Sequence, residues 1–260
     1  MDITVEVQWI DNHCHLEDDS ALSGVLAECS LAGVSQLITV GTDAASSAAG
    51  LDLASRHEQL WATAGLHPHE ADQGLQDVLQ VINDNLGNPK LVAIGECGLD
   101  YHYDHSPREV QRRVFAQQIA LAHEHHLPLV IHTRNAWDET FEILDAESIP
   151  VKTVFHCFTG GPAEAAACLD RGALLSISGI VTFPSAADVR EAVRVAPLNS
   201  LMVETDSPFL TPVPHRGRPN SPALVGLIGA EIAEQHQIPV AVVAAQTTET
   251  ARELYGLGPS

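Results

Sequence analysis

The chain has 260 residues, of which 45% are hydrophobic and 18% are charged. This length suits a (β/α)8 barrel, which needs about 250 residues, and the composition excludes a disordered chain or a membrane protein. The formal net charge of −21 at pH 7 excludes a broad basic surface that coats duplex DNA through many phosphate contacts.

The N-terminal segment gives no sign of export. MDITVEVQWIDNHCH lacks a basic region followed by an apolar stretch and a small-residue cleavage site. No apolar run in the chain approaches the roughly twenty residues of a membrane span. The five cysteines are odd in number and show no CxxC spacing, which is typical of reduced thiols rather than of a disulfide framework. We therefore expect a cytoplasmic protein.

Eight short, nearly continuous apolar runs recur along the chain, each followed by polar or glycine-containing residues and then by a helix-like segment. Such runs are typical of parallel strands that are buried on both faces. They are VQWID (7–11), QLITV (36–40), LWATAGL (60–66), LVAIG (91–95), PLVIH (128–132), TVFHC (153–157), ALLSIS (173–178) and LMVET (201–205). Eight βα units predict an α/β fold, the (β/α)8 TIM barrel. We expect one domain over residues 1–260, because no linker or low-complexity tract interrupts the chain.

The clearest helix prediction follows the fourth run. Residues 106–109, SPRE, have the pattern of a capping box with proline at the first helical position. Apolar residues then repeat on one face of the predicted helix, at Val110, Val114, Phe115, Ile119 and Ala122.

Residues of the types that bind metals follow five of the eight runs. In a barrel the carboxyl ends of the strands open on one mouth, where this fold places its chemistry. Because side chains alternate along a strand, His13 and His15 are expected to point inward together, while Cys14 points away. The candidate ligands are His13, His15, Glu96, His132, His156 and Asp206.

These donors indicate a particular kind of metal centre. Imidazole and carboxylate ligands suit Zn²⁺, with Mn²⁺, Mg²⁺ or Ni²⁺ as alternatives. Six ligands exceed the need of one tetrahedral ion, whereas two ions that share a bridging Glu96 would use all six. We therefore expect two divalent ions per subunit.

Six motifs in the chain point to one family. They are DNHCHL (11–16), GLHPH (65–69), IGECGLDY (94–101), IHTR (131–134), FHCFTG (155–160) and ETDSP (204–208). In order and spacing they resemble the TatD family of metal-dependent deoxyribonucleases, of the amidohydrolase superfamily, and the resemblance spans essentially the whole chain. Two departures are Asn135, where an aspartate is expected, and residues 220–222, Asn-Ser-Pro, where Asn-Glu-Pro is common. Both lie in substrate loops, so metal binding is expected to follow the family more closely than substrate preference does.

The resemblance implies a role for each candidate ligand. One ion would be held by His13, His15, Glu96 and Asp206, and the second by Glu96, His132 and His156. The implied activity is phosphodiester hydrolysis in DNA, with single strands trimmed in the 3′ to 5′ direction. Phosphotriesterase-like relatives bridge their metals with a carboxylated lysine at a strand end. The only lysines here, Lys90 and Lys152, begin the fourth and sixth runs at the opposite rim, which leaves Glu96 as the bridge.

Two carboxylates besides this bridge have predicted roles. Asp206 is expected to accept the proton of the water that attacks phosphorus, and Glu96 to act in catalysis as the shared ligand. Glu204 lies two residues before Asp206 on the same strand face. It either orients the ligands from a second shell around the metals or is an ordinary hydrogen-bonded carboxylate of the barrel.

Several further residues are candidates for substrate contacts. They are His67, Arg134, Arg216 and Arg218. Guanidinium groups at the carboxyl ends of the strands would pair with phosphate oxygens, although each arginine could also be an ordinary surface residue. Tyr101 and Tyr103 are suited either to stacking on a base or to a structural role in a long loop.

Two other functions remain open from the sequence. The same metal centre could hydrolyse another ester, a lactone or an amide, because fold and metals do not fix the substrate. The arginines at the strand ends favour phosphate over a neutral carbonyl. A non-catalytic metal-binding or nucleic-acid-binding protein is the third hypothesis, and the presence of all six ligand types argues against it. We expect DNA as the partner, as single strands or 3′ ends, and no membrane. The native metal, the choice of DNA over RNA and the oligomeric state stay open, with a monomer favoured.

Overall fold

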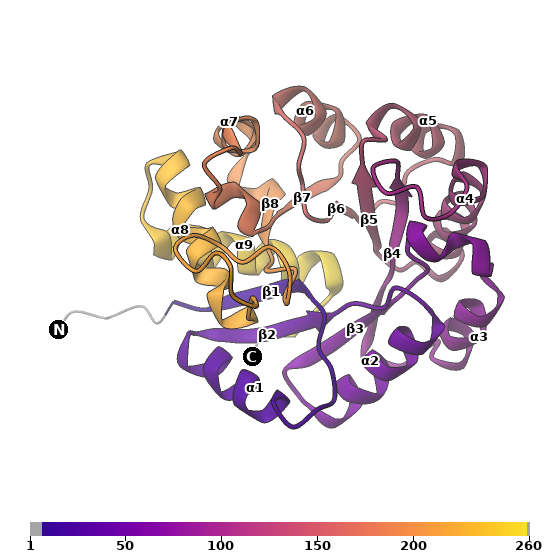
Figure 1. Cartoon of the computed structure of the whole chain (residues 1–260), viewed down its shortest axis with the longest axis horizontal. Helices are drawn as coiled ribbons and strands as arrows, with labels where there is room; N and C mark the ends of the chain where they lie inside the picture. Colours follow the sequence, from indigo (N-terminus) through magenta and orange to yellow (C-terminus); the bar gives the residue numbers. More distant parts are fainter. Residues whose placement is uncertain (1–6, 259–260) are drawn as a thin grey trace. The chain divides into compact units, whose positions relative to one another are not determined.

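The computed structural model describes residues 7–258 and has the topology of a (β/α)8 TIM barrel (Figure 1). Its strands are β1 (Trp9–Cys14), β2 (Val34–Thr39), β3 (Leu60–Ala64), β4 (Leu91–Asp100), β5 (Leu129–Arg134), β6 (Thr153–Phe155), β7 (Leu174–Ile177) and β8 (Leu201–Val203). They form one eight-stranded sheet in chain order. The predicted eight βα units are therefore confirmed. Residues 1–6, on which the expected lack of an export signal partly rests, lie outside the described residues.

Every strand is followed by at least one α-helix. The helices are α1 (Leu22–Leu31), α2 (Ala44–Arg56), α3 (Gln76–Asp84), α4 (Arg108–His125), α5 (Trp137–Glu147), α6 (Pro162–Asp170), α7 (Ala187–Val195), α8 (Val225–His236) and α9 (Val240–Tyr255). Within residues 7–258, none of them combines the length and the apolar character that crossing a membrane requires.

The described chain divides into two compact units. The first unit comprises residues 7–37, 157–169 and 174–258, and the second unit comprises residues 38–156 and 170–173. The expectation of a single domain over residues 1–260 stays a prediction. Each unit carries its own group of candidate ligands, and each is described by itself below.

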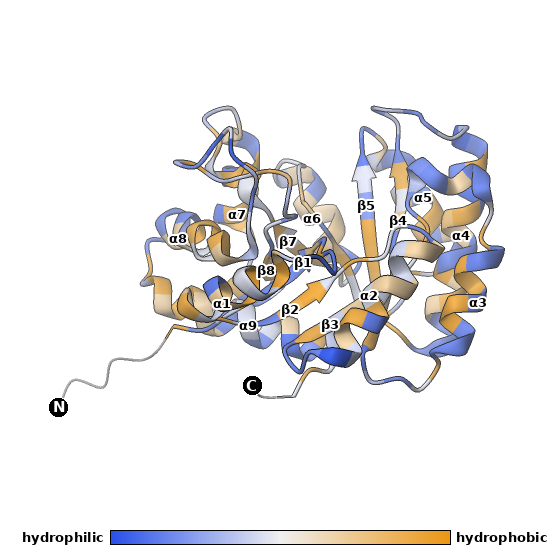
Figure 2. Ribbon diagram, turned by 60° about the horizontal axis from the view of Figure 1, so that its bottom comes forward, coloured by the Kyte–Doolittle hydropathy of each residue, from blue (hydrophilic) through white to orange (hydrophobic). Residues whose placement is uncertain are grey.

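In the second unit, strands β3 to β6 run parallel and helices α2 to α5 lie along their outer side (Figure 1). The strands are largely apolar along their length, and the arrowheads of β4 and β5 point to the same edge (Figure 2). Ile94, Val130 and Phe155, on three successive strands, are buried. Burial of such side chains stabilises the strands, and the stable strands hold the polar residues at their carboxyl ends in fixed positions.

The pairing of β4 with β5 requires a glycine at position 98. Gly98 lies opposite His132 in the parallel register, and Asp100 lies opposite Arg134. A Cβ atom on Gly98 would lie 1.9 Å from the carbonyl oxygen of His132, and the φ angle of Gly98 is +140°. Only a residue without a side chain allows this approach of the two backbones.

In the first unit, β1 and β8 contact each other, and helices α8 and α9 of the same unit pack on both strands. Trp9 at the start of β1 is buried, and its indole ring packs against α8 at Gly226 and Gly229. The chain that follows β8 returns to the end of β1, where the N–H of Asp206 donates to the carbonyl oxygen of His13 at 2.9 Å. The position of β1 therefore determines the position of the residues that follow both strands.

Some predicted strand ends are wrong. The apolar pattern ends the fourth strand at Gly95, whereas β4 continues to Asp100, and β1 and β5 also extend past their predicted ends. The ladder of backbone hydrogen bonds does not depend on side-chain polarity, so polar functional residues interrupt the apolar run without ending the strand. Glu96 consequently lies within β4 rather than in the loop after it.

The predicted capping box before α4 is also wrong. The helix begins at Arg108 without a side-chain cap. The Ser106 hydroxyl instead donates to the carbonyl oxygen of His69 at 2.8 Å and accepts from the N–H of Asp72 at 3.1 Å. Because these contacts to the short 3-10 helix η1 (Pro68–Gln73) use the hydroxyl, Ser106 connects two loops and does not start a helix.

The packing of Trp9 on α8 gives a test of the first unit. A Cβ atom on Gly229 would lie 2.1 Å from the Trp9 ring, whereas one on Gly24, in α1, would meet nothing within 4 Å. We expect Gly229→Ala to lower the free energy of unfolding by about 1–3 kcal/mol through overpacking. The control Gly24→Ala should raise it by up to about 1 kcal/mol through helix propensity. Denaturant unfolding of both variants checks this, and equal effects would contradict the packing described.

Candidate metal centre

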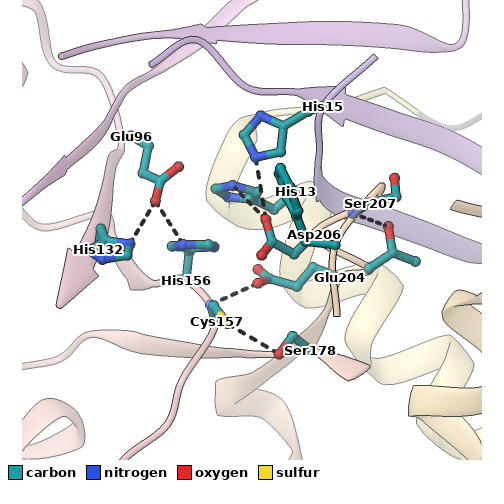
Figure 3. Close-up of polar contacts among 12 residues, drawn as sticks. His13, His15, Glu96, His132, His156, Cys157, Ser178, Glu204, Asp206 and Ser207 are labelled. Carbon is teal, nitrogen blue, oxygen red and sulfur yellow. Dashed lines mark hydrogen bonds and ion pairs between the residues drawn. The ribbon is translucent and has the colours of Figure 1, made fainter. Parts of the chain in front are cut away.

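The first unit brings His13, His15 and Asp206 together (Figure 3). Oδ1 of Asp206 lies 3.3 Å from Nε2 of His15 and 3.7 Å from Nε2 of His13. The possible ligand atoms of the three residues all lie within 4.8 Å of one another. Besides the backbone hydrogen bond from Asp206 to His13, the N–H of His15 donates to the carbonyl oxygen of Ser207 at 2.8 Å. The backbone itself thus holds the three side chains at one place.

Polar side chains at the ends of β1 and β8 reinforce this arrangement. The buried Asp11 carboxylate accepts from the N–H of Thr205 at 2.9 Å and from its hydroxyl at 2.5 Å. Burial raises the pKa of Asp11 to about 8, against the lowering effect of these hydrogen bonds. The Asn12 amide donates to the carbonyl oxygen of Val203 at 2.6 Å and to the Ser176 hydroxyl at 2.8 Å. Residues next to His13 therefore fix β1 against β8.

Glu204 is fully buried in the first unit and accepts hydrogen bonds from Cys157 and Ser176. One oxygen accepts from the N–H of Cys157 at 2.8 Å (Figure 3). The other accepts from the Ser176 hydroxyl at 2.5 Å. These contacts fit the structural reading of Glu204 as a hydrogen-bonded carboxylate. A role in orienting metal ligands stays a prediction.

The second unit gathers three imidazoles around one oxygen of Glu96. Oε1 of Glu96 lies 2.9 Å from Nδ1 of His132, 2.9 Å from Nε2 of His156 and 3.4 Å from Nε2 of His67. Figure 3 shows the carboxylate pointing toward His132 and His156, which come from β5 and from the end of β6. Four side chains from four successive strands of this unit therefore meet at their carboxyl ends.

The hydrogen bonds of His67 indicate which of its nitrogens carries the proton. Its Nδ1 accepts from the N–H of His69 at 3.1 Å, so Nδ1 is unprotonated. Burial lowers the pKa of His67 to about 4, although Glu96 nearby raises it, and the ring is neutral near pH 7. The remaining proton then lies on Nε2, which faces Glu96. His67 is thus a hydrogen-bond donor at this place, which fits a polar contact better than a metal ligand.

Asp100 is a member of this group that the sequence analysis did not single out. Its Oδ2 lies 3.2 Å from Nε2 of His132 and 2.9 Å from Nε2 of His69. Burial acts to raise the pKa of Asp100, but hydrogen bonds from His132, from the Tyr103 backbone and from His69 outweigh burial and lower it. His132 thus has a carboxylate at each ring nitrogen. Asp100, at the nitrogen that faces away from Glu96, has the position from which a carboxylate orients a metal-binding histidine.

A sequence signal for Asp100 exists. The residue lies four positions beyond Glu96, an even spacing that places both side chains on the same side of a continuous strand. The early predicted end of the fourth strand hid this relation.

The predicted phosphate-binding arginines have no acidic partner in the part of the chain that the structure describes. The Arg134 guanidinium lies over the Tyr103 ring, 4.8 Å from its centroid. The Arg216 guanidinium lies over the Phe183 ring at 3.9 Å and donates to the carbonyl oxygen of Thr211 at 3.3 Å. Arg218 is exposed.

Other arginines of this acidic chain do form ion pairs with carboxylates. They are Arg56, Arg108, Arg112, Arg171 and Arg194. Arg134 and Arg216 differ from these five in having no carboxylate partner among the described residues, although the guanidinium groups of Arg108 and Arg171 also lie over aromatic rings.

Both groups have the donor chemistry of divalent metal sites. The first offers two imidazoles and the Asp206 carboxylate, and the second offers the Glu96 carboxylate with His132 and His156. Neutral imidazoles combined with a carboxylate are the usual protein ligands of catalytic zinc and related ions. A bound cation would also offset the cost of holding carboxylates in largely buried positions. The residues present therefore fit divalent ions.

Comparison with known proteins agrees with this chemistry. The sequence model of the family described as "TatD related DNase" matches residues 10–256. The uncharacterized metal-dependent hydrolase YabD of Bacillus subtilis is 37% identical over 249 residues, covering 94% of this chain and 98% of the relative. A protein of Erwinia amylovora named 3′-5′ ssDNA/RNA exonuclease TatD is 38% identical over 233 residues, covering 87% of this chain and 90% of the relative.

Solved structures share the fold of this chain. The TatD homologue YJJV of Escherichia coli superposes with a TM-score of 0.91 at 28% identity, covering 97% of this chain and 99% of that chain. An uncharacterized amidohydrolase of Saccharomyces cerevisiae shares the fold, with a TM-score of 0.80 at 16% identity over 96% of this chain and all of that chain. The chain therefore belongs to the TatD-related DNase family and is a metal-dependent hydrolase.

Proposed function

We propose that this chain hydrolyses phosphodiester bonds in single-stranded DNA, trimming it from the 3′ end with the aid of two divalent ions. The observation that carries the proposal is the contrast between the charge of the chain and its arginines. In a chain with a net charge of −21, Arg134 lies two residues beyond His132 with no acidic partner among the described residues. An anionic substrate that reaches the candidate ligands would supply that partner. The name of the Erwinia amylovora relative, which specifies single-stranded DNA and RNA, supports the same class of substrate.

Each group of ligands would hold an ion. His13, His15 and Asp206 would bind one ion, and Glu96, His132 and His156 would bind the other. The family resemblance further predicts that Glu96 is shared by both. When bound, such ions lower the pKa of a water molecule and offset the charge of the phosphoryl oxygens.

The remaining steps fall to side chains of the chain itself. Asp206, whose carboxylate is partly exposed beside His15, is the proposed acceptor of the proton from the attacking water. His67 offers an N–H donor toward the reacting centre, because its other ring nitrogen is occupied by the His69 backbone. Asp100 keeps the His132 ring in place by accepting a hydrogen bond from its far nitrogen. Arg134 and Arg216 bind phosphate oxygens of the strand.

A nuclease assay with several substrates tests the proposal. We expect metal-loaded protein to shorten 3′-ended single strands one nucleotide at a time and to leave duplex interiors intact, because the acidic surface repels a long polyanion. Affinity should fall with salt much less steeply than the roughly tenth-power dependence of proteins that make many phosphate contacts. End-labelled single-stranded DNA, duplex DNA and RNA, followed by gel separation, give the answer. Hydrolysis of p-nitrophenyl acetate without any nucleic-acid cleavage would favour the alternative ester hydrolase instead.

Removing the charge of Glu96 tests its predicted position between two ions. We expect Glu96→Gln to lower metal content from about two ions per chain to one or fewer and to reduce nuclease activity more than about a hundredfold. Elemental analysis of protein purified without chelator measures the metal. Glu109→Gln, at an exposed position in α4, removes the same charge and should leave both quantities unchanged. Full metal occupancy in Glu96→Gln would rule out the bridging assignment.

A second pair of variants tests the phosphate role of Arg216. Arg216→Gln should reduce kcat/KM for single-stranded DNA about ten- to a hundredfold, the loss of a charge-assisted hydrogen bond of roughly 1.5–3 kcal/mol, with metal content unchanged. Arg194→Gln is the matched control, because Arg194 lies in the same unit but is already paired with Glu191. Similar small effects of both substitutions would show that only net charge matters at position 216.

A further inference from the structure

The loop between β4 and α4 presents an exposed stack of flat side chains. The Tyr103 and His105 rings are parallel within 4°, with centroids 5.5 Å apart. The Arg134 guanidinium lies over the Tyr103 ring. Tyr103 is 51% exposed, although large aromatic side chains are usually buried. Tyr103, His105 and Arg134 are called the stacking group below.

The stacking group is held in place by buried polar contacts. Oδ1 of Asp100 accepts from the N–H of Tyr103 at 2.9 Å. The His69 ring lies edge-on to both Tyr103 and His105, with centroid distances of 5.4 and 4.6 Å. Since Asp100 also accepts from His69, the loop that carries Tyr103 is fixed before any ligand binds. A fixed aromatic surface loses little conformational entropy on binding.

Tyr101 in the same loop serves as an internal contrast. It is buried, its hydroxyl donates to Glu139 at 2.7 Å, and the Arg108 guanidinium covers its ring. These contacts account for Tyr101 as a structural residue. No comparable side-chain hydrogen bond to Tyr103 is found within residues 7–258, so its exposure calls for another explanation.

The stacking group is adjacent to the candidate metal ligands of the second unit. His132 and Arg134 lie on the same side of β5, two residues apart. Asp100 contacts both His132 and His69, and His69 contacts the stacked rings. The His69 ring, with its centroid 6.4 Å from that of His132, therefore lies between the candidate ligands and the stacked rings.

We propose that Tyr103 and His105 bind a nucleobase by stacking and that Arg134 binds a phosphate of the same strand, beside the Glu96–His132 group. A ligand for this surface must be flat and anionic, because it meets aromatic rings together with a guanidinium that has no acidic partner in the described chain. A nucleotide of a single strand meets both requirements, since an unpaired base is free to stack. The inference rests on the proposed function and adds to it the means by which single strands are preferred.

A binding experiment separates stacking from phosphate attraction. The probes are a fluorescein-labelled hexathymidine with cleavage-resistant phosphorothioate linkages and a fully abasic strand of the same length. Fluorescence anisotropy is measured with the metal-loaded protein and again in EDTA. We expect Tyr103→Leu to weaken binding of hexathymidine about five- to a hundredfold and to leave binding of the abasic strand unchanged. Tyr103→Phe keeps the ring and should bind both probes as the wild type does.

Substitution of Arg134 tests the phosphate contact separately from stacking. Arg134→Gln should weaken binding of both probes to a similar degree, about tenfold, because both carry the same backbone charge. Arg113→Gln, at an exposed position in α4, is the matched control and should change neither.

The outcomes distinguish the inference from the function on which it rests. If the wild type shortens single strands but binds hexathymidine and the abasic strand equally, the stacking inference is overturned and the proposed function stands. An equal loss for both probes in Tyr103→Leu would also overturn it. If the wild type cleaves no nucleic acid, the proposed function fails, and a base-dependent affinity that Tyr103→Leu removes would still support the stacking group as a nucleotide site.

Discussion

The second unit depends on the requirement that a buried carboxylate have donors or cations around it. Glu96 is only 3% exposed, and isolation of its charge from water would be costly without compensation. His67, His132 and His156 provide that compensation by directing a ring nitrogen toward a single oxygen. Because the three imidazoles come from different strands, the carboxylate also fixes the relative positions of the strand ends. The same constraint extends outward to Asp100, which balances the far side of His132.

Charge distribution explains how an acidic chain could act on a polyanion. With 34 acidic and 13 basic residues, most of the surface repels nucleic acid at long range. Attraction is then confined to places where a cation is not already neutralised by a neighbouring carboxylate. Arg134 and Arg216 are such places, and bound divalent ions would add others. Short contacts with the end of a single nucleic-acid strand are compatible with this charge distribution, whereas extended contacts with a nucleic-acid duplex are not.

Much of the fold was predictable, because eight apolar runs of similar spacing have few other arrangements than a parallel barrel. The residue types at the ends of the runs also sufficed to pick out the histidines and carboxylates that the structure gathers into two groups. The early end predicted for the fourth strand has a physical cause. An apolar pattern reports burial, not hydrogen bonding, so it ended β4 at Gly95 and hid Asp100.

Local signals also failed where a side chain has two possible partners. Ser106 matches the pattern of a helix cap, but the sequence does not show that η1 lies close enough to take its hydroxyl. Tyr101 and Tyr103 lie in the same predicted loop, and the sequence does not tell their roles apart. Only the structure shows that Tyr101 is buried and hydrogen-bonded whereas Tyr103 is exposed. Contacts between residues far apart in the chain decide such cases, and no local pattern records them.

The fold requires a glycine at position 98, and a functional screen would mistake this structural requirement for a metal-binding role. Gly98 has no donor atom, yet any side chain there would strike the carbonyl oxygen of His132 and displace β5 from β4. The imidazole of His132 would then leave the two carboxylates that flank it. In an alanine scan scored by metal retention, position 98 would rank with the ligands themselves. A library that aims to alter metal preference should therefore keep this position fixed and vary the donors around it.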